Sequence, residues 1–209
     1  MKIAVICANG KQGKRIVQEA VARGIDVTAV VRGKNQTEAA NVIQKDLFDL
    51  TPDDLEGFDA VIDAFGAWTP DTLPQHSLSL QHLCSLVSGK ETRLLVVGGA
   101  GSLYTNPEHT AQLMDGADFP EMFKPLASSM GKALQELRTR TDVKWTYISP
   151  AGDFQADGVR TGSYQLGGEE LLLNAAGESM ISYADYAIAM VDEAVNGTHI
   201  QQRISVVSK

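Results

Sequence analysis

The sequence has few cysteines, few aromatic residues and fewer basic than acidic side chains. Two cysteines, Cys7 and Cys84, provide no disulfide framework or metal-ligand spacing, so a reducing cytoplasm fits best. The net charge of −8 argues against a broad nucleic-acid or anionic-membrane surface. There is no long apolar run, and we expect no signal peptide, because the chain enters a predicted strand at once. These absences indicate a soluble globular protein, and the length favours one domain over residues 1–209.

The first 32 residues read as strand, glycine turn, helix and strand. We predict strands over Lys2–Cys7 and Val27–Val31, with a helix over Lys14–Arg23 between them. A crossover of this length is typical of a right-handed parallel unit. The helix would then begin at the carboxyl end of the first strand, where unpaired amides and the helix dipole attract a phosphate.

The turn between this strand and helix matches a dinucleotide fingerprint at two of its three glycine positions. Cys7 replaces the first glycine, whereas Gly10 and Gly13 are present. The second glycine lets the backbone approach a pyrophosphate, and the third lets the helix pack closely on the strand. An empty structural crossover is the alternative. The residues that we predict to contact a dinucleotide here are Cys7, Asn9, Gly10, Lys11, Gln12 and Gly13.

The residue that ends the second strand bears on the choice between NAD and NADP. An NAD site usually carries a carboxylate at this place, but the strand ends in Arg32, and Asp26 begins it at the wrong end. A guanidinium suits a 2′-phosphate, because its planar donors pair well with phosphate oxygens. We therefore predict that NADP(H) is preferred over NAD(H). The alternative is a solvated arginine that only covers the adenine.

Strands and helices continue to alternate along the rest of the chain. This alternation predicts a Rossmann-like, doubly wound parallel α/β sheet with helices on both faces. Residues 151–168 are glycine-rich and polar, and we expect a long substrate-covering loop there that has room for a strand pair. The further predicted strands are Asn41–Gln44, Asp59–Phe65, Arg93–Val97, Val143–Ser149 and an edge strand over Ile200–Val207, and the further predicted helices are Leu73–Ser88, Glu121–Arg140 and Ser182–Val195.

Several strand ends carry residues that suit a nucleotide. Asp46 follows the third strand and has two open interpretations, a contact with the adenine amino group or a cap for the next turn. The small residues of Gly66–Ala67 and the glycine pair Gly98–Gly99 each follow a buried strand. Such residues permit close approach by the backbone or by a ligand.

The order of these pieces resembles the atypical short-chain dehydrogenases grouped as NADH-flavin reductases, relatives of biliverdin reductase B and NmrA-like proteins. The matching pieces run nearly end to end: MKIAVI-A-GK-G, VTAVVR, DAVIDAFG, RLLVVGGAGSL, DFP, ISPAGDF, RTGSY and ISYADYAIAMVDE. The resemblance implies that the acceptor faces Ala151, Phe154 and Tyr164. It further implies that the cofactor lies along the glycine turn and along Arg32, Asp46, Leu47, Ala64, Phe65, Gly66, Gly98, Gly99, Ser149 and Pro150.

The resemblance also exposes a missing tyrosine. Typical short-chain dehydrogenases use a Tyr-x-x-x-Lys pair as proton donor, but here Ser128 stands four residues before Lys132. Ser128, Lys132 and Tyr104 are therefore only weak catalytic candidates, and Tyr164 or His109 could donate a proton from a loop. Reduction of a ketone needs a positioned acid, whereas hydride transfer to a flavin does not.

The sequence leaves three functional hypotheses. The first is an NADPH-dependent oxidoreductase for a small planar acceptor, with FMN or FAD as a substrate rather than as a bound cofactor. The second is an NmrA-like redox sensor that binds NADP(H) without turnover. The third, a sugar-nucleotide epimerase or dehydratase, is weakest because the tyrosine and a large C-terminal substrate domain are both missing. The acceptor and the oligomeric state stay open.

Overall fold

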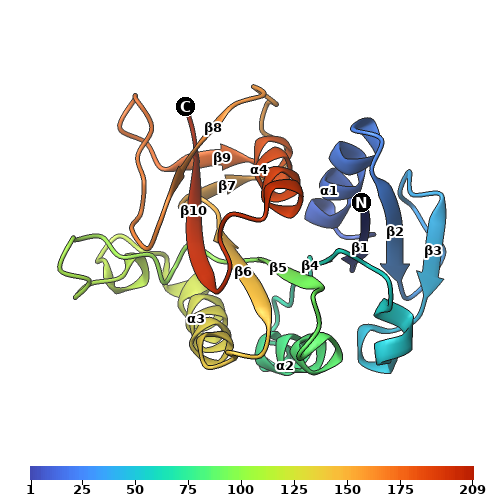
Figure 1. Ribbon diagram of the computed structural model, residues 1–209. Coiled ribbons are helices and arrows are strands. Elements are labelled where there is room, and N and C mark those ends of the chain that lie inside the picture. The colour runs from blue at the N-terminus through green and yellow to red at the C-terminus, as the bar shows by residue number, and fades with distance from the viewer.

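An eight-stranded, mostly parallel sheet forms the centre of the computed structural model, which describes residues 1–209 (Figure 1). Its strands are β1 (Lys2–Ile6), β2 (Asp26–Val31), β3 (Asn41–Gln44), β4 (Ala60–Asp63), β5 (Arg93–Val97), β6 (Lys144–Ser149), β8 (Tyr164–Gly167) and β10 (Gln202–Ser208). They lie in the order β3-β2-β1-β4-β5-β6-β10-β8, and only β8 runs antiparallel to its neighbour. The predicted single-domain, Rossmann-like α/β fold is thus confirmed.

Strand β1 lies at the point where the strand order reverses. Its apolar residues are buried on both faces, which is typical of a parallel strand covered by helices. Ile6 pairs with Val30 of β2 on one side and with Asp63 of β4 on the other. The carboxyl ends of three strands therefore meet at one crevice, the usual place for a ligand in such a sheet.

Two helices cover each face of the sheet (Figure 1). Ile3 and Val5 pack with α1 (Lys11–Ala22) and α4 (Tyr183–Asn196), whereas the alternate residues Ala4 and Ile6 pack with α2 (Gln75–Val87) and α3 (Lys124–Arg138). This alternation produces two separate apolar cores. Short 3₁₀ helices are η1 (Leu47–Asp49), η2 (Pro52–Leu55), η3 (Leu113–Asp115) and η4 (Glu121–Phe123). No helix is both long and apolar enough to span a bilayer.

The last strand is not the edge strand that the sequence predicts. β10 pairs with β6 on one side and with β8 on the other, so β8 forms the edge. Ser205 of β10 stands opposite both Ser149 of β6 and Gly167 of β8. The polar, partly exposed residues of β8 suit an edge position, but they lack the apolar run by which a buried strand is found.

The segment 151–168 is more ordered than a covering loop. The short strand β7 (Asp153–Gln155) pairs with β9 (Met180–Ser182) rather than with β8, so the two strands of this segment do not form a pair with each other. The buried Asp185 carboxylate accepts hydrogen bonds from the amides of Thr161 and Gly162 at 2.9–3.0 Å. Ser182 caps α4 by accepting from the Asp185 amide at 3.0 Å. The segment is therefore fixed to the N-terminus of α4.

Candidate functional site

Helix α1 begins at the crevice and three residues earlier than the sequence predicts. Gly10 is its N-cap, and the amide of Lys14 is the first to bond back along the helix, to the Gly10 carbonyl oxygen at 2.9 Å. The amides of Lys11, Gln12 and Gly13 consequently have no backbone partner, as expected in a first turn. The first turn also holds no acidic side chain. This helix terminus can bind a diphosphate.

The glycine turn is built as its spacing predicts, with a cysteine where a glycine is usual. Cys7 has a φ of 57°, in the left-handed region that glycine adopts without strain. A Cβ atom on residue 13 would stand 2.7 Å from the Cys7 carbonyl oxygen and 2.9 Å from the Ala8 Cα atom. Gly13 is therefore required for the helix to pack on the turn. Burial raises the pKa of the Cys7 thiol to about 12, which keeps the sulfur protonated and poorly nucleophilic.

Asn9 connects the glycine turn to the loop that follows β2. Its amide group donates to the Lys34 carbonyl oxygen at 2.9 Å and accepts from the Gln36 amide at 2.8 Å. Lys14 also donates to the Gln36 side chain at 3.0 Å. The sequence predicts Asn9 as a direct cofactor contact, and this stays a prediction; in the structure both polar groups of its side chain bind this loop. Asn9 therefore positions the segment that carries Arg32.

Arg32 presents a free guanidinium beside the crevice. Its side chain is 83% exposed, and its Nη1 atom lies 3.9 Å from the Asp46 carboxylate. Asp46 caps η1 by accepting from the Phe48 amide at 3.0 Å, which confirms the capping interpretation, whereas a contact with the adenine stays a prediction. Leu47 beside it is buried. Since no protein group occupies most of the Arg32 donors, they are available to a phosphate.

Two buried polar atoms near the crevice have no partner. Gln12 donates its Nε2 group to the Tyr183 carbonyl oxygen at 3.2 Å, but its Oε1 atom accepts no hydrogen bond. The Ser149 hydroxyl, at the end of β6 and next to Pro150, is fully buried and equally unpaired. Most buried polar groups are satisfied, so these atoms are consistent with a bound polar ligand. Together with the α1 amides, they fit a dinucleotide.

The glycine pair after β5 has a packing role. A Cβ atom on Gly98 would overlap the Tyr147 ring, and one on Gly99 would lie 2.9 Å from the Met130 sulfur. The Gly98 amide donates to the Ile148 carbonyl oxygen at 2.8 Å, and the Gly99 amide donates to the Tyr147 hydroxyl at 3.1 Å. These glycines therefore let the loop pack on β6 and α3, and a cofactor contact there stays a prediction.

Asp63, at the carboxyl end of β4, is a buried carboxylate that the sequence interpretation did not single out. It ends β4 two residues earlier than predicted, because its carboxylate accepts from the Phe65 amide at 3.0 Å and redirects the chain at Ala64 and Gly66. Its side chain faces a cavity of about 20 Å³, enough for a single water molecule, beside His76. Burial raises the pKa of Asp63 to about 6. The available signal was a carboxylate inside the apolar run DAVIDAF.

The weak catalytic candidates lie together but away from Ser149. Ser128, Lys132 and Tyr104 line one cavity that Ser149 does not line. The Lys132 side chain is 71% exposed and lies 3.4 Å from Glu136. The Tyr104 ring stacks on the His109 ring at a centroid distance of 4.4 Å, and His109 contacts Glu170 at 2.6 Å.

The predicted acceptor residues are separated in the structure. Ala151 is buried directly after β6, and the Phe154 ring packs against the rings of Tyr183 and Tyr186 at 4.1 and 4.8 Å. Tyr164 instead lies on β8, with β10 between it and β6, and its hydroxyl donates to Asp192 of α4 at 2.5 Å. Tyr164 therefore holds the sheet edge to a helix, whereas Ala151 and Phe154 stay near the crevice.

Comparisons with known proteins agree with this geometry. The model of the NAD(P)H-binding family matches residues 7–195. YwnB of Bacillus subtilis (strain 168) is 46% identical over 212 residues, covering 100% of this chain and 99% of YwnB. A crystal structure of a "putative NADH-flavin reductase" from Streptococcus pneumoniae TIGR4 is 57% identical with a TM-score of 0.98, and the match covers 100% of both chains. A Lactobacillus casei protein is 32% identical with a TM-score of 0.89, covering 100% of this chain and 99% of that one.

Proposed function

The chain belongs to the NAD(P)H-binding family, and from that premise we propose that it is an NADPH-dependent oxidoreductase acting on a small planar acceptor such as free flavin. Family membership and the 57% identical streptococcal protein support the coarser role, an NAD(P)H-dependent oxidoreductase. The preference for the phosphorylated cofactor and the flavin acceptor belong to the proposal.

The residues of the crevice suit the parts of the cofactor. When bound, a reduced dinucleotide would supply the hydride. The unpaired amides of Lys11–Gly13 would bind the diphosphate, and Arg32 would pair with a 2′-phosphate. Ser149 and Gln12 offer a buried hydroxyl and a buried amide oxygen to the remaining polar groups. Ala151 and Phe154, close to Ser149 in the chain, would border the acceptor.

The observation that supports a planar acceptor is that none of the five tyrosines is prepared to act as a proton donor. Burial raises the pKa of Tyr147, Tyr183 and Tyr186, and burial together with Asp192 raises that of Tyr164. Tyr104, the fifth, is half-buried and stacks on His109. It lines the same cavity as Lys132, but Lys132 pairs with Glu136, and no tyrosine hydroxyl bonds to a lysine, the arrangement that lowers a tyrosine pKa and prepares it to donate a proton.

This arrangement favours an acceptor that needs no proton from the protein during hydride transfer. A ketone oxygen must be protonated as hydride reaches its carbon, and that requires a positioned acid. A conjugated ring spreads the added charge and later exchanges protons with water. The protein then contributes binding, distance and exclusion of water, which the crevice residues provide without acid–base chemistry.

An anaerobic stopped-flow experiment tests the proposal. The protein is mixed with NADPH and FMN, with NADH in a parallel series, and cofactor oxidation is followed at its absorbance band. We expect NADPH oxidation well above the enzyme-free background. The same assay with FAD, quinones, biliverdin and aldehydes then identifies the preferred acceptor. Absence of oxidation with every flavin would reject the flavin acceptor.

The sensor hypothesis makes a different prediction for the same samples. A sensor would bind NADPH and NADP⁺ tightly but would oxidise no NADPH with any acceptor. Calorimetric titration of both cofactor forms, carried out beside the kinetic assay, distinguishes tight binding without turnover from a protein that does not bind the cofactor.

A further inference from the structure

A second polar cavity lies on the α3 face of the sheet, away from the crevice. Its volume is about 170 Å³. A cavity that holds a single water molecule needs a volume of only roughly 10–15 Å³. It lies between α3, β10 and the loop that follows β5, and its lining includes Ser102, Gln112, Ser128 and Gly131. The cavity therefore has room for a small molecule of several heavy atoms.

The charged side chains that line this cavity are all positive. Lys132 and Arg138 come from α3, Arg203 comes from β10, and no carboxylate lines the cavity. The molecule as a whole has a net charge of −8, so a patch of three cations is a local exception. Such a lining favours an anionic ligand.

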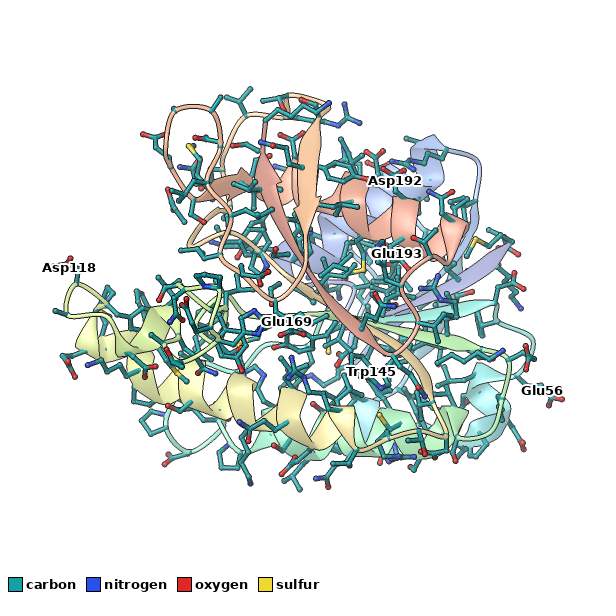
Figure 2. The ribbon with its side chains drawn as sticks, turned by 60° about the vertical axis from the view of Figure 1, so that its left-hand side comes forward. Glu56, Asp118, Trp145, Glu169, Asp192 and Glu193 are labelled. Carbon is teal, nitrogen blue, oxygen red and sulfur yellow. The ribbon has the colours of Figure 1, made fainter.

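A single carboxylate compensates the two arginines. Glu169 accepts from the Arg138 Nη2 group at 2.6 and 2.7 Å and also pairs with Arg203 (Figure 2 shows Glu169 above α3, beside β10). The Arg203 Nη1 group donates to the Ser102 carbonyl oxygen at 2.9 Å and to the Ser102 hydroxyl at 3.0 Å. Its buried Nε group has no partner. A buried donor without a partner is costly, so an acceptor there would stabilise it.

The charges around Arg203 also favour an anionic ligand. Burial lowers the pKa of Arg203, and the neighbouring Arg138 adds to that effect, although Glu169 opposes it. Lys132 pairs with Glu136, and Arg138 and Arg203 share Glu169, so two carboxylates face three cations and one positive charge is uncompensated. An anion in the cavity beside Lys132 and the unpaired Arg203 Nε group would compensate it.

We propose that this cavity binds a phosphate group, either free or carried by a small organic molecule, among Lys132, Arg138 and Arg203. Ser128 and Gln112 would add hydrogen bonds to the phosphate oxygens or to the attached group. Ser128 and Lys132 thus acquire a role that does not involve proton transfer. The site is separate from the crevice and does not depend on the proposed oxidoreductase activity.

Calorimetric titration of the full chain with inorganic phosphate and with glycerol 3-phosphate tests the site. Ionic strength is held constant, and saturating NADPH covers the α1 amides, the other place where phosphate could bind. R138Q removes one cation, and G131L fills the cavity while leaving every charge in place. A Cβ atom on residue 131 meets Ser102 and Met114 only at ordinary contact distances of 3.6 and 3.9 Å. We expect each variant to bind at least tenfold more weakly.

The control is K144Q, which removes an exposed cation at the amino end of β6, where Lys144 pairs with Glu91. Its affinity should stay within twofold of the native value. R138Q also breaks the ion pair with Glu169 and could lower stability, so a melting curve accompanies each titration. K132Q removes a cation from the cavity and leaves the Arg138–Glu169 pair in place.

The two ligands separate the possible sources of the phosphate. Equal affinities identify free phosphate, and glycerol 3-phosphate binding at least fivefold tighter identifies a phosphorylated small molecule. No binding of either ligand, or binding that R138Q, K132Q and G131L leave unchanged, would overturn the proposal.

Discussion

A Cβ atom on residue 13 would lie 2.7 Å from the carbonyl oxygen of Cys7, a separation that real Cβ atoms do not adopt. The atom that blocks it belongs to the backbone, so no side-chain rotation can relieve the contact. The same turn holds Cys7 at a φ of 57°. The geometry of the N-terminal end of α1 is thus determined by these two residues.

The variant Gly13→Ala should destabilise the protein and weaken NADPH binding together. Overpacking costs about 1–3 kcal/mol, and this exceeds the ~1 kcal/mol that alanine gains over glycine inside a helix. Urea unfolding measures the first effect and calorimetric titration the second. Gly33→Ala is the control, since a Cβ atom there meets nothing within 4 Å. Native stability in Gly13→Ala would contradict the packing argument.

The variant Arg32→Ala should change the choice of cofactor. A hydrogen bond to a charged group contributes about 1.5–3 kcal/mol, so the NADPH dissociation constant should rise on the order of 10- to 100-fold. NADH has no 2′-phosphate, and its binding should change little. Lys144→Ala, a distant loss of one positive charge, controls for general electrostatics. Equal losses for both cofactors would show that Arg32 does not read the phosphate.

The variant Asp63→Asn should stabilise the protein at pH 8 and not at pH 4. In the folded state the pKa of Asp63 is about 6, above its ordinary 3.8, so the folded state disfavours the charged form. The resulting penalty is absent below pH 3.8, develops as the pH rises to 6, and is full above that. It amounts to at most about 3 kcal/mol. Asparagine is never charged and can still accept from the Phe65 amide.

Chemical unfolding of Asp63→Asn between pH 4 and 8 measures this dependence against the native protein. The exposed Asp157→Asn serves as a matched control, because its carboxylate makes no hydrogen bond or ion pair. A stability difference that does not vary with pH would show that the burial of the Asp63 charge is not its cause.

The variant Tyr164→Phe should lower the stability of the protein and leave the KM for the acceptor unchanged. Its hydroxyl bonds to the Asp192 carboxylate, and loss of one such bond costs about 1–3 kcal/mol. The KM for FMN should stay within twofold, because β10 separates Tyr164 from the strand that ends at Ser149. Tyr104→Phe, which removes a hydroxyl that makes no hydrogen bond and keeps the stacked ring, is the stability control. A tenfold rise in KM would return Tyr164 to the acceptor site.

Local patterns in the sequence were sufficient for most of the fold. The central strands β1, β4 and β5 are short, mostly apolar runs, and the glycine turn between strand and helix places the crevice at α1. What failed depends on distant parts of the chain. The pairing of Gly167 with Ser205 makes β8 the edge, yet nothing near either residue signals it.

The candidate site was predictable for backbone positions and much less so for side chains. Glycine positions follow from the local turn, so Gly10 and Gly13 were identified correctly as parts of it. The directions of Asn9 and Tyr164 are set by Lys34 and Asp192, which are distant in sequence. Hydrogen-bond partners that are this distant in sequence are known only from the tertiary structure.

The side chain of Asn9 joins the glycine turn to the loop that follows Arg32. Because the Arg32 side chain is exposed, replacing it should leave the scaffold intact and, under the proposed function, alter only which nucleotide is preferred. Replacing Asn9 removes the hydrogen bonds to Lys34 and Gln36 that hold this loop against the glycine turn. The affinities for both dinucleotides should therefore fall together. Redesign of cofactor choice should therefore begin at position 32 and keep position 9 untouched.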